Sequence, residues 1–368
     1  MDNTILAQSA KNSNLKPRVI MMGLGLSTTT GIAKVVNNWI AAGYDRMVDL
    51  VYISTNDNQI PGQFARKLKE CLLAYIKLIK YAFSGADILH LHLAMYGSFW
   101  RKQFPLFLAR LMKIKTIIHL HGSEFKEFYE NGSWFRKLMI RNMFEKADMV
   151  FVLSREWHKW VKSITQKPGK IEIVYNTALK QKLSSKKCHE KVTITKLGRL
   201  GRRKGTYNLL DAFKRLASRY PKTRLVLAGD GEIKKVKKLV SEYNLNDRVE
   251  VPGWLSWDQV NIILAVTDIY ALPSFNEGLP NSILEAISWA IPVVSTPVGG
   301  ICEAVINEKT GFLINPGDVN MLENRLERLI VDNDMRIRMG KAGHRLFKDK
   351  FDIEGILKQI VDIQCKLI

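Results

Sequence analysis

The sequence predicts an α/β protein with two Rossmann-like domains, each built on a parallel sheet. Short apolar runs alternate with longer helical patterns along the chain, which is typical of βαβ units. A length of 368 residues is enough for two domains. A polar, charged stretch at 180–191 marks the expected linker between them.

The composition is that of a globular protein with an unusual excess of positive charge. Hydrophobic residues make up 46% and charged residues 25% of the chain. The 56 Lys and Arg against 35 Asp and Glu give a formal net charge of +21, which indicates nucleic acid, acidic lipid or phosphorylated substrates as partners. No apolar run could span a bilayer, and residues 1–10 lack the features of a signal peptide. The four cysteines lack C-x-x-C spacing, which fits a reducing cytosol and argues against zinc.

The N-terminal half starts with residues 1–16, which we expect to be loosely attached. A strand at 18–23 then leads into a glycine-containing loop that ends near Gly31, followed by an amphipathic helix over 32–42. This loop can face a phosphate or an acceptor, or it is an ordinary turn. It is not a complete G-x-G-x-x-G, so the support for dinucleotide binding is weak.

Two H-L-H patterns stand near the ends of two further strands. Alternation places His90 and His92 on one face of the first strand, and His119 and His121 on one face of the second. Four histidines raise the hypothesis of a metal site. Glu124 is the only acidic residue close to them in the sequence and no cysteine is near, so we expect no metal ion.

Aromatic and basic residues are interleaved in two stretches, 99–113 and 134–144, and lysines line one side of a helix over 66–83. These are either crossover helices with solvated basic faces or surfaces that bind a membrane. No recognised nucleic-acid module is present, so we expect no nucleic-acid partner.

The second half carries a basic loop and a glycine loop, each directly after a predicted strand. The loop GRLGRRKG at 198–205 contains Arg199 and Lys204, and a strand at 224–229 ends in AGDG with Gly229. Cations in such a loop can stabilise the charge of a diphosphate leaving group. A solvated basic turn is the alternative, which the preceding strand and following helix disfavour.

The stretch 273–300 combines a loop with two carboxylates and a helix. Glu277 lies in the loop and Glu285 lies in the helix predicted from 281 to 290, an E-x7-E pattern. Gly278 lets the backbone approach a ligand, and free amides at the helix start favour an anion. Carboxylates accept hydrogen bonds from sugar and ribose hydroxyls, so the stretch suggests a sugar-nucleotide site.

These patterns resemble the retaining glycosyltransferases of family four, of the exopolysaccharide, capsule and O-antigen type. The family has the GT-B fold, in which two Rossmann-like domains face each other across a cleft. The resemblance covers nearly the whole chain and is strongest from 196 to 318. It is carried by the G-R-x-x-x-x-K-G segment, by EGLP with Glu285 behind it, and by PVVSTPVGG and TGFLINPGD.

The resemblance implies an acceptor-binding domain over 1–180, a donor-binding domain over 181–350, and a last helix over 351–368 that packs back on the first domain. It implies that Arg199 and Lys204 clamp the donor diphosphate, that Glu277 holds the sugar, and that His121 faces the donor sugar. These four residues are the expected catalytic group. The expected donor-binding residues are Arg199, Lys204, Glu277, Gly278, Leu279, Pro280, Asn281, Glu285, Gly31 and Gly229.

The resemblance implies transfer of a sugar from a nucleotide-diphosphate donor, with a UDP-sugar favoured, to a lipid-linked saccharide in surface polysaccharide synthesis. We expect a cytoplasmic enzyme at the anionic inner face of the cell membrane, with no metal ion and no cofactor besides the donor. The alternatives are a GDP-mannose-dependent mannosyltransferase, a UDP-sugar 2-epimerase of the same fold, and a non-catalytic protein that binds polyanions or membranes.

Overall fold

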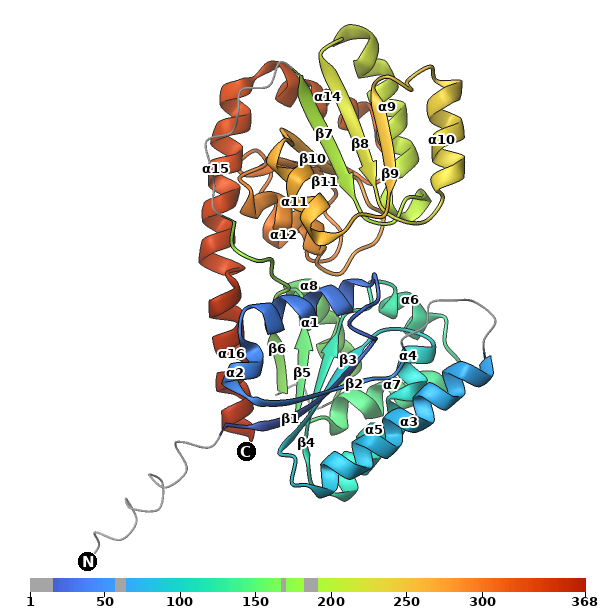
Figure 1. Cartoon of the computed structure of the whole chain (residues 1–368), viewed down its shortest axis with the longest axis vertical. Helices are drawn as coiled ribbons and strands as arrows, with labels where there is room; N and C mark the ends of the chain where they lie inside the picture. The colour runs from blue at the N-terminus through green and yellow to red at the C-terminus, as the bar shows by residue number, and fades with distance from the viewer. Residues whose placement is uncertain (1–15, 57–63, 167–169, 182–190) are drawn as a thin grey trace, which may run out of the picture. The chain divides into compact units, whose positions relative to one another are not determined.

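The structure is a computed structural model that describes residues 16–56, 64–166, 170–181 and 191–368. Within these ranges the strands form two six-stranded sheets (Figure 1), and all the strand pairs with a recorded register are parallel. The predicted α/β class with two parallel sheets is confirmed. Most of the predicted linker, and most of the expected loose N-terminal stretch, lie outside the described residues.

The chain divides into two compact units, which we describe separately. One unit comprises Met1–Leu120, Trp134–Phe151 and Leu357–Ile368, and the other comprises His121–Ser133 and Val152–Ile356. The predicted domain boundaries stay a prediction.

The first sheet has the order β2-β1-β3-β4-β5-β6. Its strands are β1 (Arg18–Gly23), β2 (Asp49–Ser54), β3 (Ile88–Leu93), β4 (Lys115–Leu120), β5 (Met149–Val152) and β6 (Ile171–Ile173). The helices between them are α1 (Gly31–Ala41), α2 (Tyr44–Met47), α3 (Phe64–Phe83), α4 (Gly97–Arg101), α5 (Gln103–Leu111), α6 (Phe125–Glu130), α7 (Trp134–Lys146) and α8 (Arg155–Ile164).

The core of the first unit lies beneath α1. Every residue of β3 is buried, as expected for a central strand of a parallel sheet covered on both faces. Trp39 of α1 is fully buried and packs on the imidazoles of three histidines in that sheet, His90, His92 and His119. The C-terminal helix α16 (Ile353–Leu367) contributes Gln364, whose Nε2 donates a 2.7 Å hydrogen bond to the buried hydroxyl of Tyr44.

The second sheet has the order β12-β11-β10-β7-β8-β9. Its strands are β7 (Val192–Leu197), β8 (Thr223–Ala228), β9 (Val249–Gly253), β10 (Ile269–Leu272), β11 (Val293–Ser295) and β12 (Gly311–Leu313). Its helices are η2 (Arg202–Lys204), α9 (Thr206–Arg219), α10 (Ile233–Glu242), α11 (Trp257–Ala265), α12 (Asn281–Ser288), α13 (Ile301–Ala304), α14 (Val319–Val331) and α15 (Asn333–Lys350).

The direction of the crossovers reverses between β7 and β10. From β7 the chain moves outward through β8 to β9, and from β10 it moves the other way through β11 to β12. Right-handed crossovers then place α9 and α10 on one face and α11 and α12 on the other. Two separate hydrophobic clusters agree with this: Phe213 of α9 belongs to one, and Ile283 of α12 belongs to the other. The carboxyl ends of β7 and β10 therefore form a topological switch point, where open α/β sheets bind ligands.

Candidate active site

Two loops meet at the switch point, one after β7 and one after β10. The first contains the short η2 turn and ends at Gly205, which has a φ of +63°. A Cβ atom on Gly205 would lie only 2.0 Å from the carbonyl oxygen of Pro273, in the second loop. Because residue 205 is glycine, the two backbones can pack directly against each other.

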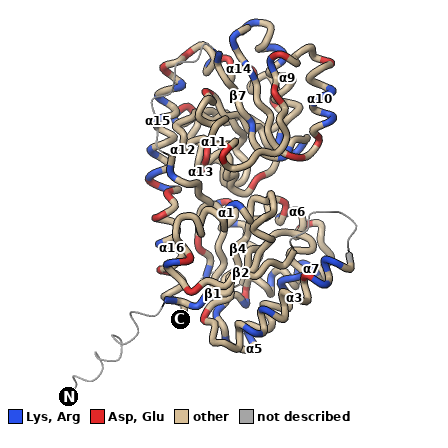
Figure 2. Tube along the Cα trace, viewed as in Figure 1, with Lys and Arg blue, Asp and Glu red and all other residues tan. Residues whose placement is uncertain are grey.

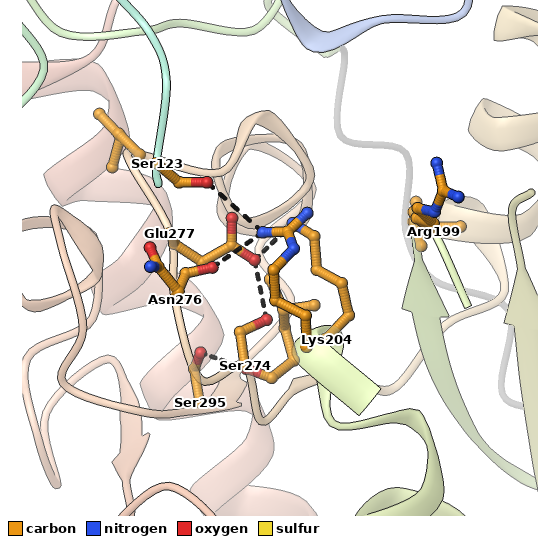
Figure 3. Close-up of polar contacts among 12 residues, drawn as sticks. Ser123, Arg199, Lys204, Ser274, Asn276, Glu277 and Ser295 are labelled. Atoms are coloured by element: carbon orange, nitrogen blue, oxygen red, sulfur yellow. Dashed lines mark hydrogen bonds and ion pairs between the residues drawn. The ribbon is translucent and has the colours of Figure 1, made fainter. Parts of the chain in front are cut away.

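Lys204 and Glu277 join these two loops through an ion pair (Figure 3). The pair is largely shielded from water, since the side chains are 17% and 6% exposed. The buried hydroxyl of Ser274 donates a 2.8 Å hydrogen bond to the same Glu277 oxygen, Oε1. The carboxylate is thus held from two sides. An ammonium group has three donors, so Lys204 can contact an anion while it remains paired.

Arg203 is a second cation at this place, and it is not among the site residues predicted from the sequence. Its Nη1 donates to the carbonyl oxygen of Asn276 at 3.0 Å and to the hydroxyl of Ser123 at 3.4 Å. Its Nε lies 3.7 Å from Glu124. The guanidinium therefore ties the loop after β10 to the residues that follow β4. The sequence shows three consecutive basic residues, and only the geometry of the η2 turn decides which of them faces Glu277.

Arg199 is not brought to the ion pair. In Figure 3 its side chain stands apart from Lys204 and Glu277 and is directed elsewhere. Its Cγ lies beside Gly231, where an added Cβ would come within 2.9 Å of it. Of the two residues predicted to clamp the diphosphate, Lys204 therefore lies at the switch point, with Arg203 beside it, and Arg199 lies apart from them.

His121 and Gly278 lie close together within the second unit. A Cβ atom on Gly278 would lie 3.5 Å from the carbonyl oxygen of His121 and 3.2 Å from Leu153. Nearby, the side-chain amide of Asn276 donates a 2.8 Å hydrogen bond from Nδ2 to Glu127 Oε1. The structure thus brings the segment that begins at His121 to the loop that carries Glu277.

The remaining predicted donor-site residues of the second unit lie around the same loops. Pro280 precedes α12, Asn281 begins it, and the buried Glu285 lies one turn further along. The carbonyl of buried Leu279 accepts a 2.8 Å hydrogen bond from Asn176. A Cβ atom on Gly229 would lie 2.1 Å from Gly198 O, so the loops after β7 and β8 also pack backbone to backbone.

Gly31 belongs to the first unit, where it begins α1. The hydroxyl of Thr30 caps this helix by accepting a 3.3 Å hydrogen bond from the Ala33 amide.

Three of the four predicted histidines form a cluster. The ring nitrogens of His90, His92 and His119 lie within 4.8 Å of one another. Their ring centroids are 4.9–5.6 Å apart and their planes differ by 11–26°. An imidazole binds a metal in its ring plane, so these near-parallel rings do not aim at one point as they stand. Burial lowers the pKa of His90 to about 3, which keeps that ring neutral. That the protein needs no metal ion stays a prediction.

Two family models match the chain in succession. Residues 33–178 match the model described as Glycosyltransferase Family 4, and residues 179–346 match the model described as Glycosyl transferases group 1. A glycosyltransferase of Methanocaldococcus jannaschii is 26% identical over 381 residues, covering 86% of this chain and 92% of that protein. The capsular polysaccharide biosynthesis glycosyltransferase CapM of Staphylococcus aureus is 24% identical over 236 residues, covering 59% and 61%.

The fold also matches solved structures. The crystal structure of Anabaena HepE in complex with UDP-glucose aligns with a TM-score of 0.73 at 17% identity, covering 95% of this chain and 99% of that one. At this level of identity the likeness shows the fold alone, and it agrees with the two parallel sheets of the GT-B class.

Proposed function

This chain is a glycosyltransferase of the GT-B fold, with a Family 4 domain followed by a group 1 domain, and we propose that it is a retaining, metal-independent enzyme that uses a nucleotide-diphosphate sugar. The proposed donor is a UDP-sugar, and the proposed acceptor is a lipid-linked saccharide in surface polysaccharide synthesis. The observation that carries the proposal is the meeting of Lys204 and Glu277 at the switch point of the second sheet.

The proposed donor pose follows from the chemistry of these side chains. Lys204 contacts the diphosphate, and Arg203 adds a second positive charge at its side. Glu277 accepts hydrogen bonds from sugar hydroxyls, and the amides at the start of α12 face the anion. Glu285, which is on the same helix, binds the ribose in the pose that the family resemblance implies.

The proposed chemistry needs cations more than a base. When the bond between the sugar and the diphosphate breaks, negative charge builds up on the leaving phosphate. Positioned cations in a site of low exposure stabilise this charge, and removing one such group commonly costs about 10²–10³ in rate. In the front-face displacement that the resemblance implies, the leaving phosphate helps to deprotonate the acceptor, so no protein nucleophile is assigned.

The donor and the role of Lys204 can be tested together. UDP- and GDP-sugars are screened by thermal shift, because a ligand that binds the folded state raises its apparent stability. The Lys204→Met variant should lose transfer by about 10²–10³ with the donor found. Lys234→Met removes an exposed lysine on α10 and should leave transfer unchanged. Equal rates for both variants would show that Lys204 does not contact the leaving group.

The first unit carries a surface that suits an anionic membrane. Among the described residues no helix is both long and apolar enough to cross a bilayer. Lys and Arg nevertheless lie along α3, α5 and α7 (Figure 2), together with exposed apolar side chains. These are Leu68, Leu72, Leu73, Ile76 and Phe83 of α3, Phe104, Phe107 and Leu111 of α5, and Trp134, Phe135 and Leu138 of α7.

We propose that these three helices dock the enzyme on the cytoplasmic face of the membrane, where a lipid-linked acceptor is found. Apolar side chains that insert at the interface and basic residues that attract anionic lipid both contribute to such binding. The Phe107→Ser, Leu111→Ser double variant should sediment less with anionic vesicles at low salt. Ile337→Ser, at an exposed position on α15, is the control. Failure of the wild-type protein to sediment with anionic vesicles would remove this part of the proposal.

A further inference from the structure

A fully buried lysine lies at the end of β7, directly before the loop that carries Arg203 and Lys204. The side chain of Lys196 has no exposed surface. Its Nζ donates to two backbone carbonyls, at 3.3 Å to Arg199 O and at 3.5 Å to Gly198 O. The same Gly198 carbonyl is the atom that leaves no room for a side chain at residue 229. Lys196 therefore lies where the loops after β7 and β8 pack together.

Among the residues that the structure describes, no carboxylate forms an ion pair with this buried amine, whose hydrogen bonds go to two backbone carbonyls. Moving an ammonium group out of water costs free energy unless an opposite charge or a full set of hydrogen bonds replaces its hydration. Two neutral carbonyls replace that hydration only in part. Burial, followed by the nearby Lys204, lowers the pKa of Lys196 to about 7. In the protein without nucleotide the amine is consequently close to its midpoint at neutral pH.

The charged groups around Lys196 come from three loops. Lys204 and Arg203 in η2 disfavour its ammonium form, whereas Glu277 after β10 and Asp230 after β8 favour it. Lys204 is the second-largest cause of the lowered pKa, after burial, and it is the residue that we place on the donor diphosphate. A diphosphate at Lys204 brings two negative charges close to the buried amine and offsets that repulsion.

We propose that Lys196 is a proton-accepting positioning residue, which becomes an ammonium when the donor diphosphate binds and then holds the carbonyls of residues 198 and 199. The inference rests on the proposed function, since it needs a diphosphate at Lys204. The neutral amine gains one proton from the buffer, and no other bond is made or broken. Binding of the nucleotide sugar and uptake of the proton are therefore coupled by linkage.

The coupling has a defined sign. Above pH 7 the free protein holds Lys196 mostly neutral, so the bound state carries more protons than the free state. The affinity for the nucleotide sugar should fall as the pH rises from 7 to 9, by up to about tenfold per pH unit. Below pH 6 the free protein already carries this proton, and the affinity should become independent of pH.

The test is calorimetry of the wild-type enzyme with UDP-glucose and with GDP-mannose, because the diphosphates of these molecules do not titrate between pH 6 and 9. Titrations at pH 8 in Tris and in HEPES give the number of protons taken up, since the two buffers differ in heat of ionisation. We expect about one proton per bound nucleotide sugar at pH 8 and almost none at pH 6. Lys196→Met should abolish the uptake, and Lys234→Met should retain it.

The possible failures separate the two proposals. If neither nucleotide sugar binds the wild-type enzyme, the proposed function is overturned and this inference with it. If one of them binds with no proton uptake at pH 8, only the inference is overturned. Uptake that persists in Lys196→Met assigns the proton to another group. If Lys196→Met does not fold, the wild-type affinity decides, because a value that stays constant from pH 7 to 9 contradicts the coupling.

Discussion

Replacing Ser274 with alanine tests whether the orientation of Glu277 matters for catalysis. The Ser274 hydroxyl donates a 2.8 Å hydrogen bond to Glu277 Oε1 in a buried site. A hydrogen bond to a charged group contributes about 1.5–3 kcal/mol, so its loss corresponds to a fall of about 10–150-fold in kcat/KM if the bond acts fully in the transition state. Lys204 still contacts the carboxylate in this variant, so the charge at the site is unchanged.

The control is Ser295→Ala. Ser295 is equally buried, and its hydroxyl donates a 2.6 Å hydrogen bond to the carbonyl of Leu272, which is a different group from the Glu277 carboxylate. Both variants remove one buried hydroxyl at the carboxyl edge of the same sheet, so both should lower the free energy of unfolding. The expected loss is about 1 kcal/mol for the bond to a neutral carbonyl in Ser295→Ala and about 1.5–3 kcal/mol for the bond to the carboxylate in Ser274→Ala. Initial rates of transfer and denaturant unfolding are measured for both. Equal transfer rates for Ser274→Ala and Ser295→Ala would show that the hydrogen bond from Ser274 to Glu277 does not contribute to catalysis.

Three further predictions concern Gly299, which packs against the backbone of Glu277, the partly buried carboxylate of Glu303, and metal ions. In Gly299→Ala, a Cβ atom would lie 2.0 Å from the carbonyl of Glu277 at a φ of +58°, so transfer should be lost, whereas Gly355→Ala, with no atom within 4 Å, should be active. Although burial opposes it, the hydrogen bond from Lys350 helps to hold the pKa of Glu303 below its usual range. The stability that this ionised carboxylate contributes is therefore present above about pH 4.5 and lost as the pH falls further, so the free energies of urea unfolding of wild type and Glu303→Gln should differ at pH 7 and approach each other as the pH falls below 4.5. Dialysis against EDTA should leave transfer intact, and a loss that Mg²⁺ or Mn²⁺ restores would contradict the metal-independent mechanism.

The sheets, and the position of Lys204 and Glu277 at one sheet edge, could be predicted from the sequence for a simple physical reason. A parallel strand buried on both faces is a short apolar run, and the loop that follows it reaches the binding edge of the sheet. Lys204 and Glu277 each stand a few residues after such a run, so their positions along the chain suffice to place them at one edge. The backbone contacts at Gly205 and Gly229, where only glycine fits, are known from the structure alone.

The parts that could not be predicted depend on side-chain direction and on distant contacts. Arg199 and Arg203 have the same chemistry and lie four residues apart, and the sequence does not show that Arg203 contacts Asn276. Glu303 accepts hydrogen bonds from the Arg155 amide, 148 residues earlier, and from Lys350, 47 residues later. The residues next to Glu303 in the sequence do not indicate these contacts, because the partners come together only when the sheet has formed.

The central claim is that the donor diphosphate lies at the switch point between β7 and β10, in contact with Lys204. A crystal structure with the nucleotide sugar selected by the thermal-shift screen tests this directly. We expect a phosphate oxygen within hydrogen-bonding distance of Lys204 Nζ and a sugar hydroxyl hydrogen-bonded to Glu277. A diphosphate bound elsewhere, for example in the basic groove lined by Lys191, Arg224 and Arg248 at the opposite edge of the sheet, would contradict it.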